Sequence, residues 1–330
     1  MDLKYLVVGA GATGGVIAAY LKRAGKDVSI IARGESYRAI NEKGITVLTP
    51  HDNPYADKSR PTFPNHNRVV YPPQEDIVVP VKAYTEDEYQ DEPDVVFVCV
   101  KDYSLPQIYP FLDRICGGHT VVIPIQNALT TGDKLAGVLT KRPLIAPGVA
   151  YVAVMRVEPG VIKQKLNFYT IVFGRQDCKE PTPEMNQICD DLVECGIDAM
   201  FTRNPLQAAI RKYFRVSISS ALMCAFNVNM GGMIENIECR KLFVEMGNDL
   251  KALAEAIGAP FTDYPDPLSE SIVAIWDGMP EYRTSMKLDF DSGKTPEYQT
   301  QIFDVIEMGR KYGLPMNGYY KVAKMLGYDR

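Results

Sequence analysis

The sequence is short of histidine and of paired cysteines, and both shortages argue against classes of chemistry. Among the 330 residues, histidine occurs only at positions 51, 66 and 119. His51 and His66 lie in a proline-rich segment, His119 follows two glycines, and none is placed like a catalytic base. Acid–base chemistry would therefore fall to lysine or carboxylate side chains. The seven cysteines form no Cys-x-x-Cys pair, which argues against a zinc site or a disulfide framework and is typical of a reduced, intracellular protein.

Long apolar runs and an excess of positive charge are also missing. No stretch reaches the ~18 consecutive apolar residues of a membrane-spanning helix, and the N-terminal apolar segment lacks the basic flank of a signal peptide. The formal net charge of -5 argues against nucleic acid or an anionic membrane as the main partner. We expect a cytoplasmic protein with a small-molecule partner, either a monomer or a homodimer.

A glycine-rich turn near the N-terminus separates an apolar segment from a helical pattern. Residues 3–8 form a short apolar run that predicts a buried strand, and residues 16–21 continue in helical spacing. The turn between them consists of Gly9, Ala10, Gly11, Ala12, Thr13 and Gly14. Strand, G-x-G-x-x-G and helix in this order are typical of a dinucleotide-binding fold, which holds a pyrophosphate at the N-terminus of the helix. These six residues are cofactor-binding candidates; the alternative is a purely structural turn.

The residue after the second predicted strand, 28–32, bears on the choice of cofactor. NAD-binding folds usually place Asp or Glu here to hold the ribose hydroxyls, whereas this chain has Arg33. A guanidinium group pairs well with a 2′-phosphate, so the sequence favours NADP. The alternative is a solvated surface arginine.

The pattern of predicted elements changes near residue 203 and divides the chain into two domains. Residues 1–203 contain strands and helices, whereas residues 204–330 contain helical patterns only. These later helices are predicted over 206–227, 235–257, 267–277, 296–312 and 317–326. The predicted fold class is therefore α/β, with an N-terminal Rossmann-type dinucleotide-binding domain followed by an all-helical C-terminal domain.

Two strands of the first domain end in polar residues. The strand predicted over 94–100 ends at Lys101, and the strand over 120–125 is followed by Gln126 and Asn127. Ligands of an open parallel sheet bind at the carboxyl ends of its strands. We therefore expect Lys101 and Asn127 in the same crevice as the glycine turn.

The rest of the first domain is less regular. Prolines make the segment 50–76 a predicted peripheral loop or lid, and the short strand that follows at 77–79 can only be an edge strand. Further strands are predicted over 144–154 and 165–173 with a turn at Pro159-Gly160 between them, and a helix is predicted over 183–195.

Several motifs in this order resemble the ketopantoate reductase family, the NADPH-dependent 2-dehydropantoate 2-reductases. The matching pieces are GAGATGG at the start, VCVKDY around Lys101, IPIQNA around Asn127, PGVI at 159–162, IRKYF around Lys212 and TSMKLDFDSGKTPE from Thr284 to Glu297. Ser285, Asp289, Gly293 and Glu297 fit the family pattern S-x-x-x-D-x-x-x-G-x-x-T-E, although Thr295 comes one position early. The resemblance extends over nearly the whole chain.

The resemblance implies reduction of a small 2-keto acid, most simply of 2-dehydropantoate (ketopantoate) to pantoate in pantothenate biosynthesis. Lys212 would be the general acid that protonates the new alkoxide, and Glu297 would hold the substrate hydroxyl or orient Lys212. Ser285 would bind the substrate carboxylate, while Lys101 and Asn127 would contact nicotinamide and substrate. Hydride transfer to a ketone builds negative charge on oxygen, which a nearby ammonium group stabilises. Alternatively, Lys212 is a solvated helix lysine and Glu297 serves only the dipole of a predicted helix that it begins.

The chain departs from the family on the helix after Lys212. Where the family usually has asparagines, four and eight residues on, this chain has Val216 and Ser220, and we keep Ser220 as a substrate-binding candidate. Asn227 or Asn229 could replace a family asparagine further along. These departures leave two alternatives open. One is a dehydrogenase of the same fold that acts on another keto or hydroxy acid, and the other is a non-catalytic NADP(H)-binding sensor.

Overall fold

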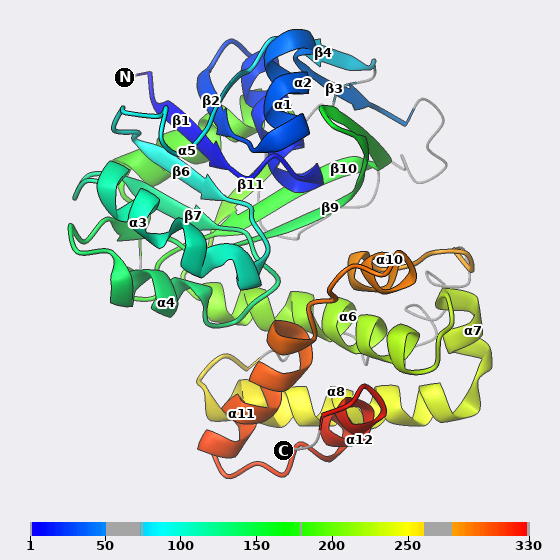
Figure 1. The fold of residues 1–330 in the computed structure, drawn as a ribbon. Helices are drawn as coiled ribbons and strands as arrows, with labels where there is room; N and C mark the ends of the chain where they lie inside the picture. Colours follow the sequence, from blue (N-terminus) through cyan, green and yellow to red (C-terminus); the bar gives the residue numbers. More distant parts are fainter. Residues whose placement is uncertain (1, 51–72, 74, 179, 261–278, 329–330) are drawn as a thin grey trace. The chain divides into compact units, whose positions relative to one another are not determined.

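The computed structural model describes residues 2–50, 73, 75–178, 180–260 and 279–328 (Figure 1). The chain divides into two compact units, which we describe separately. The first unit comprises Met1–Gln126 and Thr130–Pro205, and the second comprises Asn127–Leu129 and Leu206–Arg330. Most of the predicted loop at 50–76 and the predicted helix at 267–277 lie outside the described residues. Among the helices that are described, none is long and apolar enough to cross a membrane.

A six-stranded parallel sheet organises the first unit (Figure 1). In spatial order its strands are β5 (Lys82–Tyr84), β2 (Asp27–Ile31), β1 (Lys4–Val8), β6 (Val95–Val98), β7 (Val121–Pro124) and β8 (Leu144–Ile145). All neighbouring pairs run parallel. Numbered within this sheet, the order is 3-2-1-4-5-6, as in the doubly wound dinucleotide-binding fold, and the strand order reverses between β1 and β6. Ligands of such sheets bind at that reversal, beyond the carboxyl ends of the strands.

Both faces of this sheet are buried, which explains the continuous apolar run of β1. Alternate residues of a strand point to opposite faces. Tyr5 and Val7 belong to the hydrophobic core that includes helix α1 (Ala12–Arg23). Leu6 and Val8 belong to a second core with helices α3 (Leu105–Ile115) and α4 (Thr131–Val138). The predicted α/β domain with a Rossmann-type order is thus confirmed.

A second sheet, which the sequence did not reveal as separate, completes the first unit. Its strands follow the order β11 (Asp198–Phe201), β10 (Val161–Phe173), β3 (Ile45–Leu48) and β4 (Ile77–Val79), and β9 (Gly148–Glu158) pairs antiparallel with β10. The edge position predicted for residues 77–79 is confirmed. The single strand predicted over 144–154 is wrong, because its residues belong to β8 of one sheet and β9 of the other. Helices α2 (Gly34–Lys43) and α5 (Pro183–Glu194) also belong to this unit.

The described part of the second unit is helical, as predicted. Its elements are α6 (Pro205–Ala225), α7 (Met230–Glu235), α8 (Ile237–Ala256), α10 (Ser285–Asp291), a π-helical turn η2 (Gln299–Phe303), α11 (Asp304–Lys311) and α12 (Asn317–Met325). A hydrophobic core that includes Phe214, Ile218, Met246 and Val322 joins α6, α8 and α12.

The prediction for the second unit needs correction in two respects. Helices α7 and α10 were not predicted. The helix predicted to begin at residue 296 starts later, because residues 294–297 are not helical. The carbonyl of Glu297 accepts a hydrogen bond from the N–H of Gln301 at 3.1 Å, so Glu297 flanks the helical turn instead of belonging to its first turn.

Candidate functional site

The glycine turn connects β1 with α1, and two of its glycines are required by packing. Gly9 has φ of +113°, and a Cβ there would lie 3.0 Å from Val100 Cγ1. A Cβ on Gly14 would lie 2.2 Å from the carbonyl oxygen of Gly9 and 3.0 Å from Cys99 Cβ. Only glycine allows this turn and this close approach of helix and strand.

Gly11 has no such structural requirement. It precedes α1 with φ of -80° and ψ of -173°, a conformation open to any residue, and a Cβ at this position would meet nothing within 4 Å. The first turn of α1, which is described throughout, carries no acidic residue. The space beside Gly11 is thus open, and the free N–H groups and positive dipole end of a helix N-terminus favour an anion there. A pyrophosphate fits this arrangement of Ala10, Gly11, Ala12 and Thr13.

Gln126, which the sequence analysis did not single out, fixes the backbone beside the glycine turn. It follows β7 and is buried. Its Nε2 donates to the carbonyl oxygens of Val98 and Val100, both at 3.0 Å. Lys101 comes directly after this segment and is half-buried. The position of Gln126 at a strand end, next to Asn127, was the only sequence signal for it.

Arg33 stands between β2 and α2, at the end of the sheet where a cofactor ribose would bind. Its side chain is 57% exposed and also contacts two polar side chains. Nε donates to Glu86 Oε1 at 3.0 Å, Nη2 donates to the same oxygen, and Nη1 donates to Gln107 Oε1 at 3.3 Å. Arg33 is therefore an exposed arginine that also contacts two polar side chains.

Lys212 lies on α6 of the second unit, next to a tyrosine that ties three segments together. The hydroxyl of Tyr213 is 2.6 Å from the carbonyl oxygen of Asn127 and 3.1 Å from that of Thr300. Asn127 therefore packs with the second unit, whereas Lys101 belongs to the first. One residue after Lys212, the tyrosine holds both the 127–129 segment and the turn that follows Glu297.

The structure brings the charges of Lys212 and Glu297 into interaction. Glu297 is only 5% exposed, and Gln301 Nε2 lies 3.5 Å from its Oε2. Lys212 remains partly accessible, but its ammonium group is desolvated. This burial lowers the pKa of Lys212 to about 8, and the carboxylate of Glu297 acts in the opposite direction by favouring the charged form. A lysine with such a pKa can exchange a proton near neutral pH.

Ser220 lies two helical turns after Lys212, on the same side of α6 as Val216. It is fully buried, and its Oγ finds no hydrogen-bond partner within the described part of the chain. The neighbouring Ser217 is used structurally, since its hydroxyl bonds the Gln301 carbonyl and lies 2.9 Å from the hydroxyl of Tyr319. Ser220 therefore adds a polar atom to α6 that the observed packing does not satisfy.

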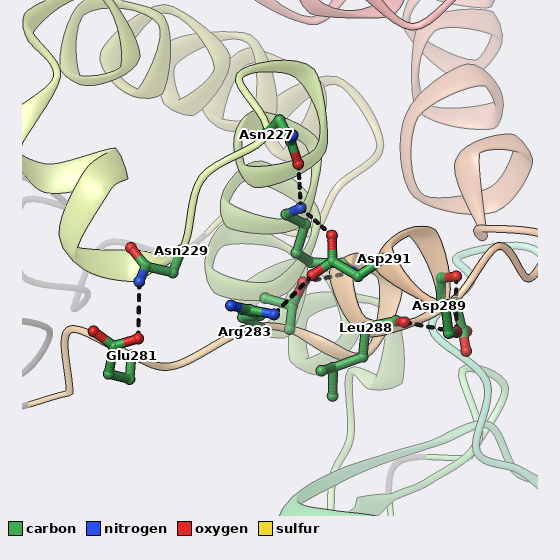
Figure 2. Close-up of polar contacts among 10 residues, drawn as sticks. Asn227, Asn229, Glu281, Arg283, Leu288, Asp289 and Asp291 are labelled. Atoms are coloured by element: carbon green, nitrogen blue, oxygen red, sulfur yellow. Dashed lines mark hydrogen bonds and ion pairs between the residues drawn. The ribbon is translucent and has the colours of Figure 1, made fainter.

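Ser285 is the exposed first residue of α10, and a polar network fastens this helix to the end of α6 (Figure 2). Lys287 Nζ donates to Asn227 Oδ1 at 2.7 Å and forms an ion pair with Asp291. Asn229 Nδ2 donates to Glu281 Oε2 at 3.2 Å. Both asparagines thus have structural partners in the segment that carries Ser285.

The fold and the glycine turn define a dinucleotide-binding protein with an appended helical unit, and the comparison with known proteins gives the family. The chain matches the family "Ketopantoate reductase PanE/ApbA" over residues 5–177 and "Ketopantoate reductase PanE/ApbA C terminal" over residues 204–326. The chain belongs to the ketopantoate reductase family, as its motifs predicted. This is a family of dinucleotide-binding reductases.

Similar proteins include 2-dehydropantoate 2-reductases along nearly their whole length. The protein from Aquifex aeolicus is 22% identical over 99% of this chain and 96% of its own length. The protein from Mesorhizobium japonicum is 26% identical over 95% of this chain and 93% of its own. These relatives are oxidoreductases.

Solved structures share the fold. The 2-dehydropantoate 2-reductase of Geobacter metallireducens superimposes with a TM-score of 0.82 at 24% identity, covering 98% of this chain and 99% of its own. A D-mandelate dehydrogenase bound to NADH and anilino(oxo)acetate superimposes with a TM-score of 0.78 at 16% identity, covering 98% of this chain and 97% of its own. The same architecture thus occurs in proteins named for different substrates.

Proposed function

We propose that this protein is an NADPH-dependent reductase of a small 2-keto acid, converting 2-dehydropantoate (ketopantoate) to pantoate. The observation that carries the proposal is the interaction of Lys212 with Glu297. It provides a desolvated ammonium group with a pKa near 8, kept charged by a buried carboxylate. A ketone reductase needs such a group, because its product alkoxide requires a proton. The names of the full-length relatives agree with this activity.

The glycine turn and Arg33 are the proposed cofactor-binding residues. The open space beside Gly11 leaves room for a pyrophosphate at the start of α1, and Arg33 provides a cation for the 2′-phosphate. When bound, the reduced nicotinamide supplies the hydride that adds to the keto carbon. Lys101 and Asn127 are proposed to contact the nicotinamide and the substrate.

In this proposal Lys212 acts on the keto oxygen. Its ammonium group donates a hydrogen bond to that oxygen, stabilises the negative charge that develops there and then transfers a proton to it. Glu297 keeps Lys212 protonated at neutral pH and accepts a hydrogen bond from a substrate hydroxyl. Ser285 binds the substrate carboxylate, and the unsatisfied hydroxyl of Ser220 is a further group for the substrate.

A panel of 2-keto acids tests the proposal. NADPH consumption is followed with 2-dehydropantoate and with keto acids that differ in the substituent on the keto carbon. Lys212→Ala is compared with Lys241→Ala, which removes an exposed lysine paired with Glu238 elsewhere in the same unit. We expect turnover with 2-dehydropantoate, a strong loss in Lys212→Ala and none in Lys241→Ala. Equal activity of the two variants would remove Lys212 from the mechanism.

A second candidate function is reduction of another 2-keto acid on the same scaffold. Val216 favours it, because a branched apolar side chain stands where the family usually has an asparagine, and it cannot hydrogen-bond a hydroxylated substrate. A higher kcat/KM for an apolar 2-keto acid than for 2-dehydropantoate would favour this candidate. NADPH binding without turnover of any keto acid would instead support a non-catalytic sensor.

A further inference from the structure

The ion pair between Arg33 and Glu86 lies where the cofactor specificity of this fold is decided. Nε and Nη2 of Arg33 both donate to Glu86 Oε1, and Nη1 donates to Gln107. A guanidinium group has five N–H donors, so three of them are engaged. The Nε–Nη2 edge is one that can grip a phosphate with two parallel hydrogen bonds. In this chain a carboxylate occupies that edge.

Glu86 is held in this position by its own turn. It follows β5, which lies next to β2 in the sheet, and the N–H of Ala32 donates to the carbonyl of Tyr84 at 3.0 Å. Within the turn, the N–H of Thr85 donates to Glu88 Oε2 at 2.9 Å and the N–H of Glu88 donates to Thr85 Oγ1 at 3.3 Å. These reciprocal bonds fix the backbone on both sides of Glu86.

Arg114, on α3, fastens the same turn from the other side. Its Nη2 donates to the carbonyl oxygen of Glu86 at 2.6 Å, and its Nη1 donates to that of Tyr89 at 2.9 Å. The Glu86 side chain is only 21% exposed, although it lies at the surface end of the sheet. The contact with Arg33 is therefore built into the turn and is not a chance meeting of two surface side chains.

We propose that Glu86 is a cofactor-specificity residue that opposes Arg33 and reduces the preference for NADPH over NADH. This inference rests on the proposed cofactor site and refines it. A 2′-phosphate bound at Arg33 must share the guanidinium with the Glu86 carboxylate, and the two negative charges repel each other. The ribose 2′-hydroxyl of NADH is uncharged, so Glu86 does not repel it.

The expected size of the effect follows from Coulomb's law. A single negative charge about 6 Å from a doubly charged phosphate weakens binding about tenfold in a water-like dielectric, and salt reduces this to about threefold. Glu86→Gln removes the charge and keeps the shape. It should therefore tighten NADPH binding about three- to tenfold and change NADH binding less than about twofold.

The experiment is a titration of the full-length protein with NADPH and with NADH, followed by cofactor fluorescence, so that it needs no keto acid. Asp87→Asn is the matched control, because it removes an exposed carboxylate from the next position of the same turn. We expect Asp87→Asn to bind both cofactors like the wild type. The Glu86→Gln effect should also shrink at high salt.

The outcomes separate this inference from the proposed function. If the wild type binds NADPH and Glu86→Gln leaves its dissociation constant unchanged or raises it, the role of Glu86 is refuted while the reductase proposal stands. An equal gain in Asp87→Asn would also refute it, because the effect would then be one of general charge. If the wild type binds neither cofactor, both the inference and the proposed function are wrong.

Discussion

Replacing Glu297 by glutamine perturbs the pKa of Lys212 in a direction that the structure fixes. Burial lowers that pKa from its ordinary value of 10.5 to about 8, while Glu297 raises it. Glu297→Gln keeps the hydrogen-bonding shape of the side chain and removes its charge. The remaining influence is desolvation, which favours neutral lysine, so the pKa of Lys212 should fall below 8.

The size of this fall in pKa follows from the typical effect of one charged group on the pKa of another. An opposite charge at close range shifts a pKa by about one to three units, so the variant should have a Lys212 pKa of about 7 or lower. A general acid must be protonated to act. At pH 7, a pKa of 8 leaves about nine-tenths of the lysine protonated, and a pKa of 7 leaves about half. At pH 8.5 the two fractions are about a quarter and about one-thirtieth, so the loss of activity grows with pH.

The assay is kcat as a function of pH, with NADPH consumption as the readout and saturating keto acid. The wild-type rate should decline as pH rises through about 8, and the Glu297→Gln rate should decline from a lower pH. The control is Glu245→Gln, which removes an exposed carboxylate paired with Lys321 in the same unit. An unchanged profile in Glu297→Gln, or a shift to higher pH, would refute the coupling of the two residues.

Alanine variants of Lys212 and Glu297 test the same pair without a pH profile. Lys212→Ala should lower turnover by ~10²-fold or more, the usual scale for a general acid, with little change in NADPH affinity. Glu297→Ala should also reduce activity. The double variant should lose less than the product of the two single losses, because the groups act as a unit. Independent, multiplicative losses would contradict this.

Three further predictions concern cofactor binding and stability. Arg33→Ala should weaken NADPH binding more than NADH binding in a fluorescence titration, and equal losses would remove Arg33 from the 2′-phosphate site. Gly14→Ala should destabilise the fold by about 1–3 kcal/mol in denaturant unfolding, because its Cβ would overlap the Gly9 carbonyl. Gly11→Ala should unfold like the wild type but bind NADPH more weakly. Lys212→Met should raise the unfolding temperature at pH 7. The pKa of Lys212 is about 8 in the folded protein and 10.5 ordinarily, so keeping this lysine protonated in the folded state at pH 7 costs stability, and methionine removes that cost. This gain should shrink as pH rises above 8, and a gain that stays constant with pH would contradict the burial argument.

The central strands β1, β2, β6 and β7 and the glycine turn could be predicted because their signals are local. A buried parallel strand is apolar throughout, and Gly9, Gly11 and Gly14 each follow from a backbone requirement or an open approach. The second sheet could not be predicted in the same way. Its strand β10 pairs with β9 nearby but also with β3, more than a hundred residues earlier in the chain. No local pattern records such a pairing.

Residues that act through tertiary neighbours escaped the sequence for the same reason. Glu86 reaches Arg33 only because β5 lies beside β2, and Gln126 acts by bonding the end of β6. The short helix α10 was missed because seven residues with an exposed Phe290 give little helical pattern. Its stability depends on contacts such as that between Lys287 and Asn227.

The central claim is that the protein reduces 2-dehydropantoate with NADPH. The direct measurement is the stoichiometry of the reaction: the purified protein is incubated with both compounds, NADPH loss is followed by absorbance, and pantoate is identified by mass spectrometry. We predict one pantoate formed for each NADPH consumed, with the rate falling as pH rises through about 8. Tight NADPH binding with no pantoate formed, and no NADPH consumed with any keto acid of the panel, would contradict the claim.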